Sequence, residues 1–258
     1  MSEVDAVVVG AGPNGLGAAI TLAEAGVSVL LIDKASEPGG ALRSSELTLA
    51  GFVHDLGASV FPLAALSPLI CSDATAEHGL KFSHPPIPAA HPLDGTSVAL
   101  YHDLNETLAG LYRGAGTYKR ALAPFLDAPE ASLEIVLGAI FRWPTRPLHT
   151  SALGARLLTP PKLTASLMRS APAAALWAGI AAHGVVPLHQ PVAGGFAVTL
   201  AAAAHLNGWP FAVSGAGNIS RALVSRFEAA GGKVELSSEV RSMADLPPHQ
   251  VVLFDTAP

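Results

Sequence analysis

The chain of 258 residues is poor in cysteine and in charge. Its single cysteine, Cys71, excludes a disulfide framework and a cysteine-based metal cluster, and we expect it to be a buried apolar residue in a reducing compartment. Only 14% of the residues are charged and the net charge is −5, with no block of Lys and Arg, so the composition does not favour nucleic-acid binding. His84 and His91 lie among prolines instead of at the spacing of helical metal ligands, so we expect no metal site.

The sequence also lacks a membrane-spanning run and a secretion signal. Residues 170–220 contain no Asp, Glu, Lys or Arg, but prolines and histidines interrupt their apolar runs before the ~18 residues that a span needs. We expect interior helices at 173–183 and 192–205 that line an apolar substrate cavity or pack on a partner. Peripheral membrane contact stays open, although no basic amphipathic face accompanies the apolar one. The N-terminus has no basic region, so we expect a cytoplasmic protein without a cleaved signal peptide.

What the sequence does contain is a glycine-rich turn between a strand and a helix. The apolar run at residues 6–9 is typical of a strand buried on both faces of a parallel sheet. The turn at residues 10–15 reads GAGPNG and leads into an Ala-rich helical segment. A second apolar run, at 29–32, stops at Asp33. A strand, a glycine turn, a helix and a strand with an acid at its tip form the βαβ unit that holds a dinucleotide.

Each residue type in the turn suits that chemistry. Gly10 permits the tight turn, Gly12 lets the backbone approach a pyrophosphate, and Gly15 lets the helix pack close to the strand. Pro13 fits a first helical position, where its missing N–H costs nothing. The free N–H groups of the turn, including that of Asn14, and the positive end of the helix dipole are expected to face the diphosphate.

The segment after the second strand narrows the choice of dinucleotide. Asp33 lies 23 residues after Gly10, near the spacing of the acid that bonds the ribose hydroxyls. It is followed by KASEPGGALR, and a plain nicotinamide dehydrogenase does not need this Gly-Gly and arginine. The segment resembles the FAD-binding N-terminus of phytoene desaturase-like flavoproteins, relatives of the amine oxidases. The resemblance implies FAD as the cofactor and extends its site to Lys34, Gly40, Ala41 and Arg43. Arg43 then neutralises the pyrophosphate or, alternatively, forms a surface salt bridge.

Two later stretches resemble the same family. The run AGFVHDLGAS, residues 50–59, is similar to the family's GF-x-x-D-x-G-A run, which implies that Gly57 and Ala58 pass beside the flavin ring. A helix at 219–230, with Asn218 as its N-cap, precedes a strand at 233–237. In the family the valine after this strand, here Val240, meets the FAD adenine through its backbone, whereas an ordinary exposed strand end is the alternative. His54 and Asp55 would face opposite sides of a strand, so we assign no catalytic residue.

The expected fold is α/β, with a Rossmann-like FAD-binding domain built on a parallel sheet and a largely helical α+β substrate-domain insertion. We expect the first part of the FAD-binding domain at 1–85, the insertion at 86–210 and an incomplete return segment at 211–258. The other expected elements are a strand at 97–101, a helix at 103–112 capped by Asp103, a helix at 117–126, a loop at 141–150 and a strand at 251–254.

The resemblance covers only the family's N-terminal half. It implies an FAD-dependent oxidoreductase of the desaturase or dehydrogenase type, or its FAD-binding half, in which an apolar substrate such as an isoprenoid or carotenoid gives a hydride to the flavin. A second chain that supplies the C-terminal half, a homo-oligomer and a truncated product all remain open. Two other functions also remain open: a non-catalytic FAD-binding or partner-binding subunit of a split flavoenzyme, and an NAD-binding dehydrogenase domain.

Overall fold

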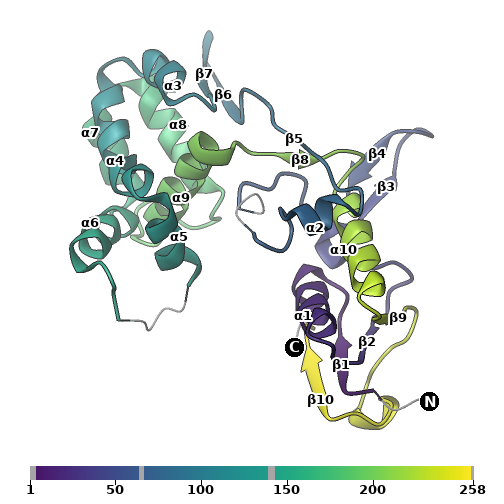
Figure 1. The fold of residues 1–258 in the computed structure, drawn as a ribbon. Helices are drawn as coiled ribbons and strands as arrows, with labels where there is room; N and C mark the ends of the chain where they lie inside the picture. The colour runs from purple at the N-terminus through teal and green to yellow at the C-terminus, as the bar shows by residue number, and fades with distance from the viewer. Residues whose placement is uncertain (1–3, 64–66, 139–142, 257–258) are drawn as a thin grey trace. The chain divides into compact units, whose positions relative to one another are not determined.

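The structure is a computed structural model that describes residues 4–63, 67–138 and 143–256. It divides into two compact units, one made of residues 1–83 and 210–258 and the other of residues 84–209 (Figure 1). The parallel-sheet Rossmann-like fold expected from the sequence is confirmed in the first unit.

The first unit is built on a four-stranded parallel sheet in the order β10-β1-β2-β9. In chain order its elements are β1 (Ala6–Val9), α1 (Pro13–Glu24), β2 (Val29–Ile32), η1 (Gly40–Leu42), β3 (Ser44–Glu46), β4 (Val53–Asp55), α2 (Asp73–Ala76), β5 (Phe82–Ser83), β8 (Phe211–Ala212), α10 (Gly217–Ala229), β9 (Lys233–Glu235), η4 (Met243–Asp245) and β10 (Val251–Phe254). Two antiparallel pairs, β3-β4 and β5-β8, complete the unit.

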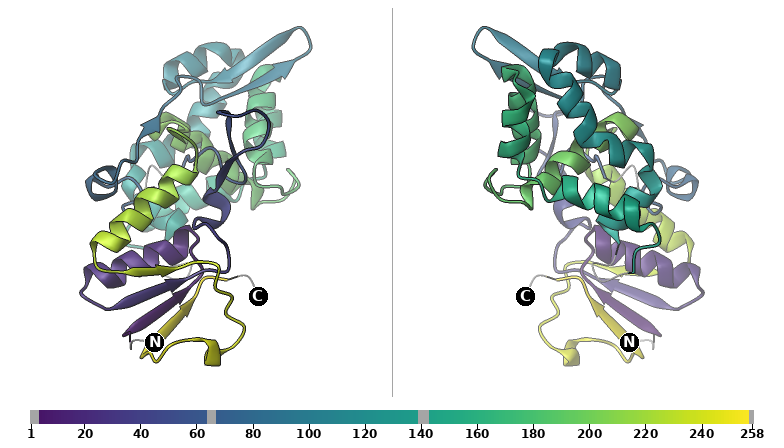
Figure 2. Two further views of the ribbon diagram at one scale, coloured as in Figure 1. Left: turned by 90° about the vertical axis from the view of Figure 1, so that its right-hand side faces the viewer. Right: turned by 90° about the vertical axis from the view of Figure 1, so that its left-hand side faces the viewer.

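Both faces of strand β1 are buried, as its unbroken apolar run requires. Ala6 and Val8 belong to the core that α1 and α10 close over one face of the sheet (Figure 2). Val7 and Val9 pack on the other face in a smaller cluster that includes Leu246. Each large apolar side chain buried in this way contributes about 1.5–3 kcal/mol, and together they fix the sheet that carries the glycine turn.

The second unit is a helical bundle with one β-hairpin. In chain order its elements are β6 (Ala89–Leu93), β7 (Thr96–Leu100), α3 (Leu104–Gly110), η3 (Tyr112–Gly114), α4 (Ala115–Asp127), α5 (Pro129–Leu137), α6 (Pro147–Leu157), α7 (Pro161–Met168), α8 (Ala171–Ala182) and α9 (Ala193–Asn207). The uncharged helices α8 and α9 lie in its core. Trp177 of α8 packs edge-on against Tyr118 of α4, with ring centroids 5.9 Å apart, and Tyr118 is hydrogen-bonded to His205. No helix in the described ranges is long and apolar enough to cross a membrane.

Several local expectations are wrong. Cys71 is exposed, not buried. Asn218 is not an N-cap, because α10 already begins at Gly217 and the side-chain amide of Asn218 instead donates to the carbonyl of Gly79. Strand β9 stops at Glu235, because Ser237 has a φ of +56°. The expected loop at 141–150 contains the start of α6, and its residues 141 and 142 lie outside the described ranges.

Candidate functional site

A pocket of about 530 Å³ lies in the first unit at the carboxyl ends of β1 and β2. Seven of the residues that the sequence singles out line it: Gly10, Gly12, Asp33, Lys34, Gly40, Arg43 and Val240. The pocket also lies at the carboxyl end of β10, on the other side of β1 from β2. The strand order changes direction here, so this is the topological switch point at which open α/β sheets bind their ligands.

The glycine turn has little room for side chains. Gly10 has a φ of +109°, and a Cβ there would overlap the backbone carbonyl of Asp255. A Cβ on Gly15 would overlap the carbonyl oxygen of Gly10. The first glycine therefore makes the turn, and the third lets α1 begin directly against it.

The N-terminus of α1 is capped by a residue from the far end of the chain. Pro13 occupies the first turn of the helix, as expected, and its N-cap residue, Gly12, has no side chain to offer. The backbone N–H of Gly15 instead donates to Oδ2 of Asp255, at 2.7 Å. The N-terminus of a helix attracts anions, and here a carboxylate of the chain itself fills that role. A Cβ on Gly12 would lie 3.3 Å from the same oxygen.

Asp255 was missed by sequence reasoning as a site residue. It directly follows β10 and lines the pocket, but only the pairing of β10 beside β1 brings it to the glycine turn. A usable signal did exist, since an acid that ends an apolar run mirrors Asp33 at the end of β2.

The carboxylate of Asp33 is held by two backbone donors. The N–H of Ala11 donates to Oδ2 at 2.6 Å, and the N–H of Ala35 donates to Oδ1 at 2.8 Å. The side chain is half-buried and lines the pocket beside the exposed Lys34. The acid therefore has a fixed position, while each of its oxygens keeps a lone pair for a further donor such as a ribose hydroxyl.

The second glycine pair, at 39–40, lies against the first turn. The N–H of Gly39 donates to the carbonyl of Ala11 at 2.7 Å, and Gly39 has a φ of +119°. Gly40 packs against Gly12, since a Cβ on it would lie 3.4 Å from the Cα of Gly12. The Nε of Arg43 donates to the carbonyl of Gly40 at 3.1 Å, which holds this exposed arginine at the pocket.

The other predicted residues do not line the pocket. Pro13 and the exposed Asn14 lie in the first turn of α1. Gly57 and Ala58 support the second glycine pair: the N–H of Ala58 donates to the carbonyl of Ala41 at 3.0 Å, and a Cβ on Gly57 would lie 2.6 Å from that oxygen. Their observed contact is thus with the backbone next to Gly40. Any contact that they make with a cofactor stays a prediction.

Asp55 of the run at 50–59 fixes the start of α10. Its Oδ1 accepts from the N–H of Ala216 at 2.7 Å and from the hydroxyl of Ser44, and its Oδ2 accepts from the hydroxyl of Ser59. Burial acts to raise the pKa of Asp55, but the hydrogen bonds from Ser59, Ser44 and Ala216 outweigh it and hold this pKa below its usual value. The acid of this run therefore has an architectural role in the described chain.

Val240 lines the pocket together with residues of the glycine turn. It is half-buried and packs on the small cluster behind β1 and β2. On either side of it, Glu239 and Arg241 form an exposed ion pair with a closest N–O distance of 2.6 Å. No group of three or more His, Cys, Asp or Glu residues that could hold a metal ion is found in the described ranges.

Comparison with known proteins agrees with this geometry. Residues 8–69 match the family described as an NAD(P)-binding Rossmann-like domain. This part of the chain is therefore similar to a Rossmann-like dinucleotide-binding domain, in agreement with its parallel sheet.

Individual proteins that are similar to this chain indicate a more specific group. The chain is 35% identical over 117 residues to one of the subunits of limonene dehydrogenase from Castellaniella defragrans, a match that covers 44% of this chain and 21% of the relative. It is 30% identical over 123 residues to hydroxyneurosporene desaturase of Rhodobacter capsulatus, covering 46% and 24%. The structure of putrescine oxidase bound to putrescine superposes with a TM-score of 0.56 at 22% identity, covering 93% of this chain and 52% of that chain. The resemblance to phytoene desaturase-like proteins is confirmed, over a region that spans a quarter or less of these curated relatives and about half of that solved structure.

Proposed function

We propose that the pocket binds FAD and that the chain is the FAD-binding part of an oxidoreductase of the desaturase or dehydrogenase type. The observation that carries the proposal is the pair of glycine segments, 10–15 and 39–40, which pack against one another at the switch point of the sheet. The first segment suits any dinucleotide, whereas the second extends the backbone surface along the path that an extended FAD follows.

Different residues of the pocket would contact different parts of the cofactor. The N-terminus of α1 with Gly12 would take the diphosphate, Asp33 the ribose hydroxyls, and Arg43 a phosphate charge, with Val240 near the adenine. The pocket already draws an anion to that helix end, since the carboxylate of Asp255 is bound there. FAD, when bound, supplies the capacity to accept a hydride. The described residues bind and orient it, and none of them is assigned a catalytic role.

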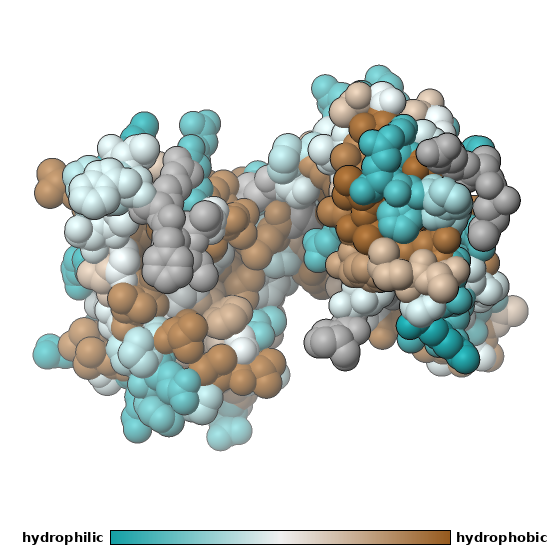
Figure 3. Space-filling view, turned by 90° about the horizontal axis from the view of Figure 1, so that it is seen from below, coloured by the Kyte–Doolittle hydropathy of each residue, from teal (hydrophilic) through white to brown (hydrophobic). Residues whose placement is uncertain are grey.

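An apolar, isoprenoid-like substrate is the class that the two curated relatives named above support. Limonene and hydroxyneurosporene, which their names contain, are both isoprenoids. The uncharged stretch at 170–220 provides apolar helices, and hydrophobic side chains reach the surface of both units in the face drawn in Figure 3.

We also propose that further polypeptide, in the same or a second chain, completes the enzyme. Strand β10 is an edge of the sheet, and its Val251, Leu253 and Phe254 are between 38% and 54% exposed. An apolar edge strand left open to water is an aggregation hazard that native proteins normally cover.

The test is a binding measurement on the purified chain, with FAD and NAD⁺ titrated separately and bound flavin read from its absorbance. We expect FAD to bind and NAD⁺ to bind at least tenfold more weakly. Gly12→Val should lower FAD affinity by tenfold or more, because its side chain fills the cradle. Gly154→Val is the control, since that glycine lies in α6 with open space around it. Preferential binding of NAD⁺ would replace the flavin assignment by a nicotinamide one.

A further inference from the structure

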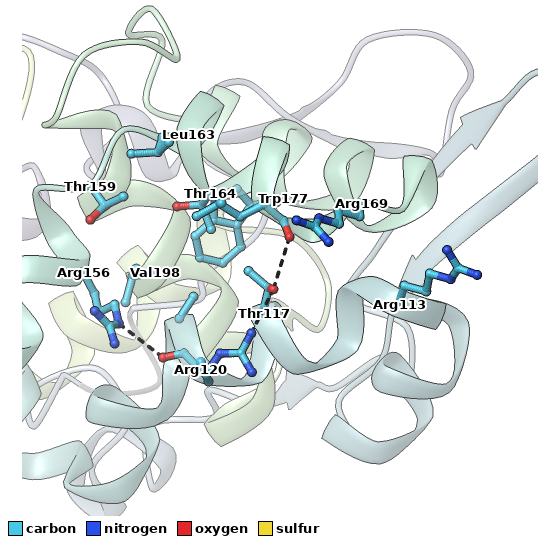
Figure 4. A pocket seen from close by; sticks show the side chains of 12 residues that line it. Arg113, Thr117, Arg120, Arg156, Thr159, Leu163, Thr164, Arg169, Trp177 and Val198 are labelled. Carbon is cyan, nitrogen blue, oxygen red and sulfur yellow. Dashed lines mark hydrogen bonds between the residues drawn. The ribbon is translucent and has the colours of Figure 1, made fainter.

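The helical unit contains a second pocket, of about 690 Å³, that is lined by arginines (Figure 4). Four of them surround it: Arg113, Arg120, Arg156 and Arg169. They come from η3, from α4, from α6 and from the C-terminal end of α7, so four separate segments contribute positive charge to the lining of one pocket. No Asp or Glu is among the residues that line it.

The guanidinium groups have few partners in the described part of the chain. Nε of Arg156 donates to the carbonyl of Arg120, and Nη2 of Arg120 donates to the hydroxyl of Thr117, both neutral acceptors. No side-chain hydrogen bond or ion pair joins Arg113 or Arg169 to another described residue. Each guanidinium has five N–H donors, so most donors at this opening face solvent.

Arg169 is held at the opening by an unusual backbone. It is the C-cap of α7 with a φ of +51°, a position where glycine or asparagine is the usual residue. An arginine in the left-handed region costs about 1 kcal/mol. Despite this cost, the residue at this position is an arginine, and it lines the pocket.

The rest of the lining is apolar. Trp177 and Val198, from α8 and α9, are buried side chains of the core that form part of the wall, and the exposed Leu163 of α7 adds to it. The ring of Trp177 packs edge-to-face with Tyr118 in the core behind this wall. A volume of this size is typical of a small-molecule site.

We propose that this pocket binds a small anionic amphiphile, with a phosphate or carboxylate group held by the arginines and an apolar body against Trp177 and Leu163. Guanidinium groups bind such oxyanions through paired, charge-assisted hydrogen bonds. The charge of the unit agrees: residues 84–209 contain eight Lys and Arg against six Asp and Glu, whereas the remainder of the chain contains seven against fourteen. This site does not depend on the proposed cofactor.

The test is calorimetric titration of the full chain with three probes: hexyl phosphate, inorganic phosphate and hexanol. We expect saturable one-to-one binding of hexyl phosphate, weaker binding of inorganic phosphate and none of hexanol. The double variant Arg120→Gln/Arg156→Gln should weaken hexyl phosphate binding by roughly ten- to a hundredfold. The matched control Lys119→Gln/Arg146→Gln removes the same charge from α4 and from the N-cap of α6, outside the pocket lining, and should bind as the wild type does.

Arg169→Gln gives a second reading, because its guanidinium makes no side-chain hydrogen bond or ion pair with another described residue, so the substitution breaks none. It should also weaken binding. Retention of the chain on phosphatidylglycerol but not phosphatidylcholine vesicles, lost in the double variant, would identify a lipid headgroup as the source of the anion. Binding of hexyl phosphate without such retention would identify a soluble ligand. The proposal is overturned if hexyl phosphate shows no saturable binding, if hexanol binds equally well, or if the double variant and its control bind alike.

Discussion

Asp255 offers the sharpest test of the dinucleotide site, because its carboxylate has two opposing effects. It caps α1 by accepting from the N–H of Gly15, and it places a negative charge at the helix end where a diphosphate would bind. We therefore compare Asp255→Asn, which removes the charge but keeps an oxygen that can accept the same hydrogen bond, with Asp255→Ala, which removes both.

The two effects have separate magnitudes. Losing an N-cap oxygen costs about 1 kcal/mol, so Asp255→Ala should be less stable to urea by about that amount, and Asp255→Asn by a few tenths at most. A unit charge about 5 Å from a phosphate in an exposed setting repels it by about 1–2 kcal/mol. Both variants should therefore bind FAD roughly five- to thirtyfold more tightly than the wild type, provided that the measurement is made at low salt.

The assay is flavin fluorescence titration at two salt concentrations, paired with urea unfolding. Glu228→Gln serves as the control, since it makes the same charge change on an exposed residue of α10 that does not line the pocket. If both Asp255 variants bound FAD more weakly while remaining folded, Asp255 would be a ligand of the cofactor and the competition argument would be wrong.

Three further substitutions test the architecture of the first unit. Gly15→Ala should cost about 1–3 kcal/mol in urea unfolding, because the new methyl group overlaps the carbonyl of Gly10. Because the pKa of Asp55 is lowered by folding, its contribution to stability is complete above its unfolded-state pKa and is lost as the pH falls through its folded-state pKa. Asp55→Asn should therefore lower the stability near neutral pH and make the loss of stability at acid pH less steep. Arg226→Lys should cost about 1–2 kcal/mol, since lysine cannot make both bonds to Glu24 and also reach the carbonyl and hydroxyls at α2; a thermal midpoint equal to that of the wild type would contradict this.

The part of the site that the sequence predicts well is the part that is local in the chain. The strand, glycine turn, helix and second strand of residues 6–32 fall where they were expected, because each position is determined by its neighbours. The residues that were missed act across long separations. Asp255 meets Gly15 across 240 positions, and Asp55 meets Ala216 across 161. No pattern within a short window contains such pairs, and only the order of the strands brings them together.

Three of the helices that were not predicted share a different feature. Helices α5, α6 and α7 each begin with a proline in the first turn: Pro129, Pro147 and Pro161. Proline is common there, because the first N–H groups of a helix have no partner within it. The same argument correctly places Pro13 in α1, whereas no helix was predicted to start at the three later prolines. A proline followed by an apolar period is therefore better interpreted as the start of a helix.

The two pockets use different physics to attract an anion, and this separates them experimentally. The pocket at the glycine turn contains three acids, Asp33, Glu239 and Asp255, against two cations, so its attraction for a diphosphate has to come from backbone N–H groups and the dipole of α1. Salt screens the repulsion from those acids, so dinucleotide affinity should hold or rise as salt is added. The arginine pocket has four cations and no acid in its lining, so salt should weaken anion binding there. Opposite salt responses within one chain would show that each unit binds its anion by its own mechanism.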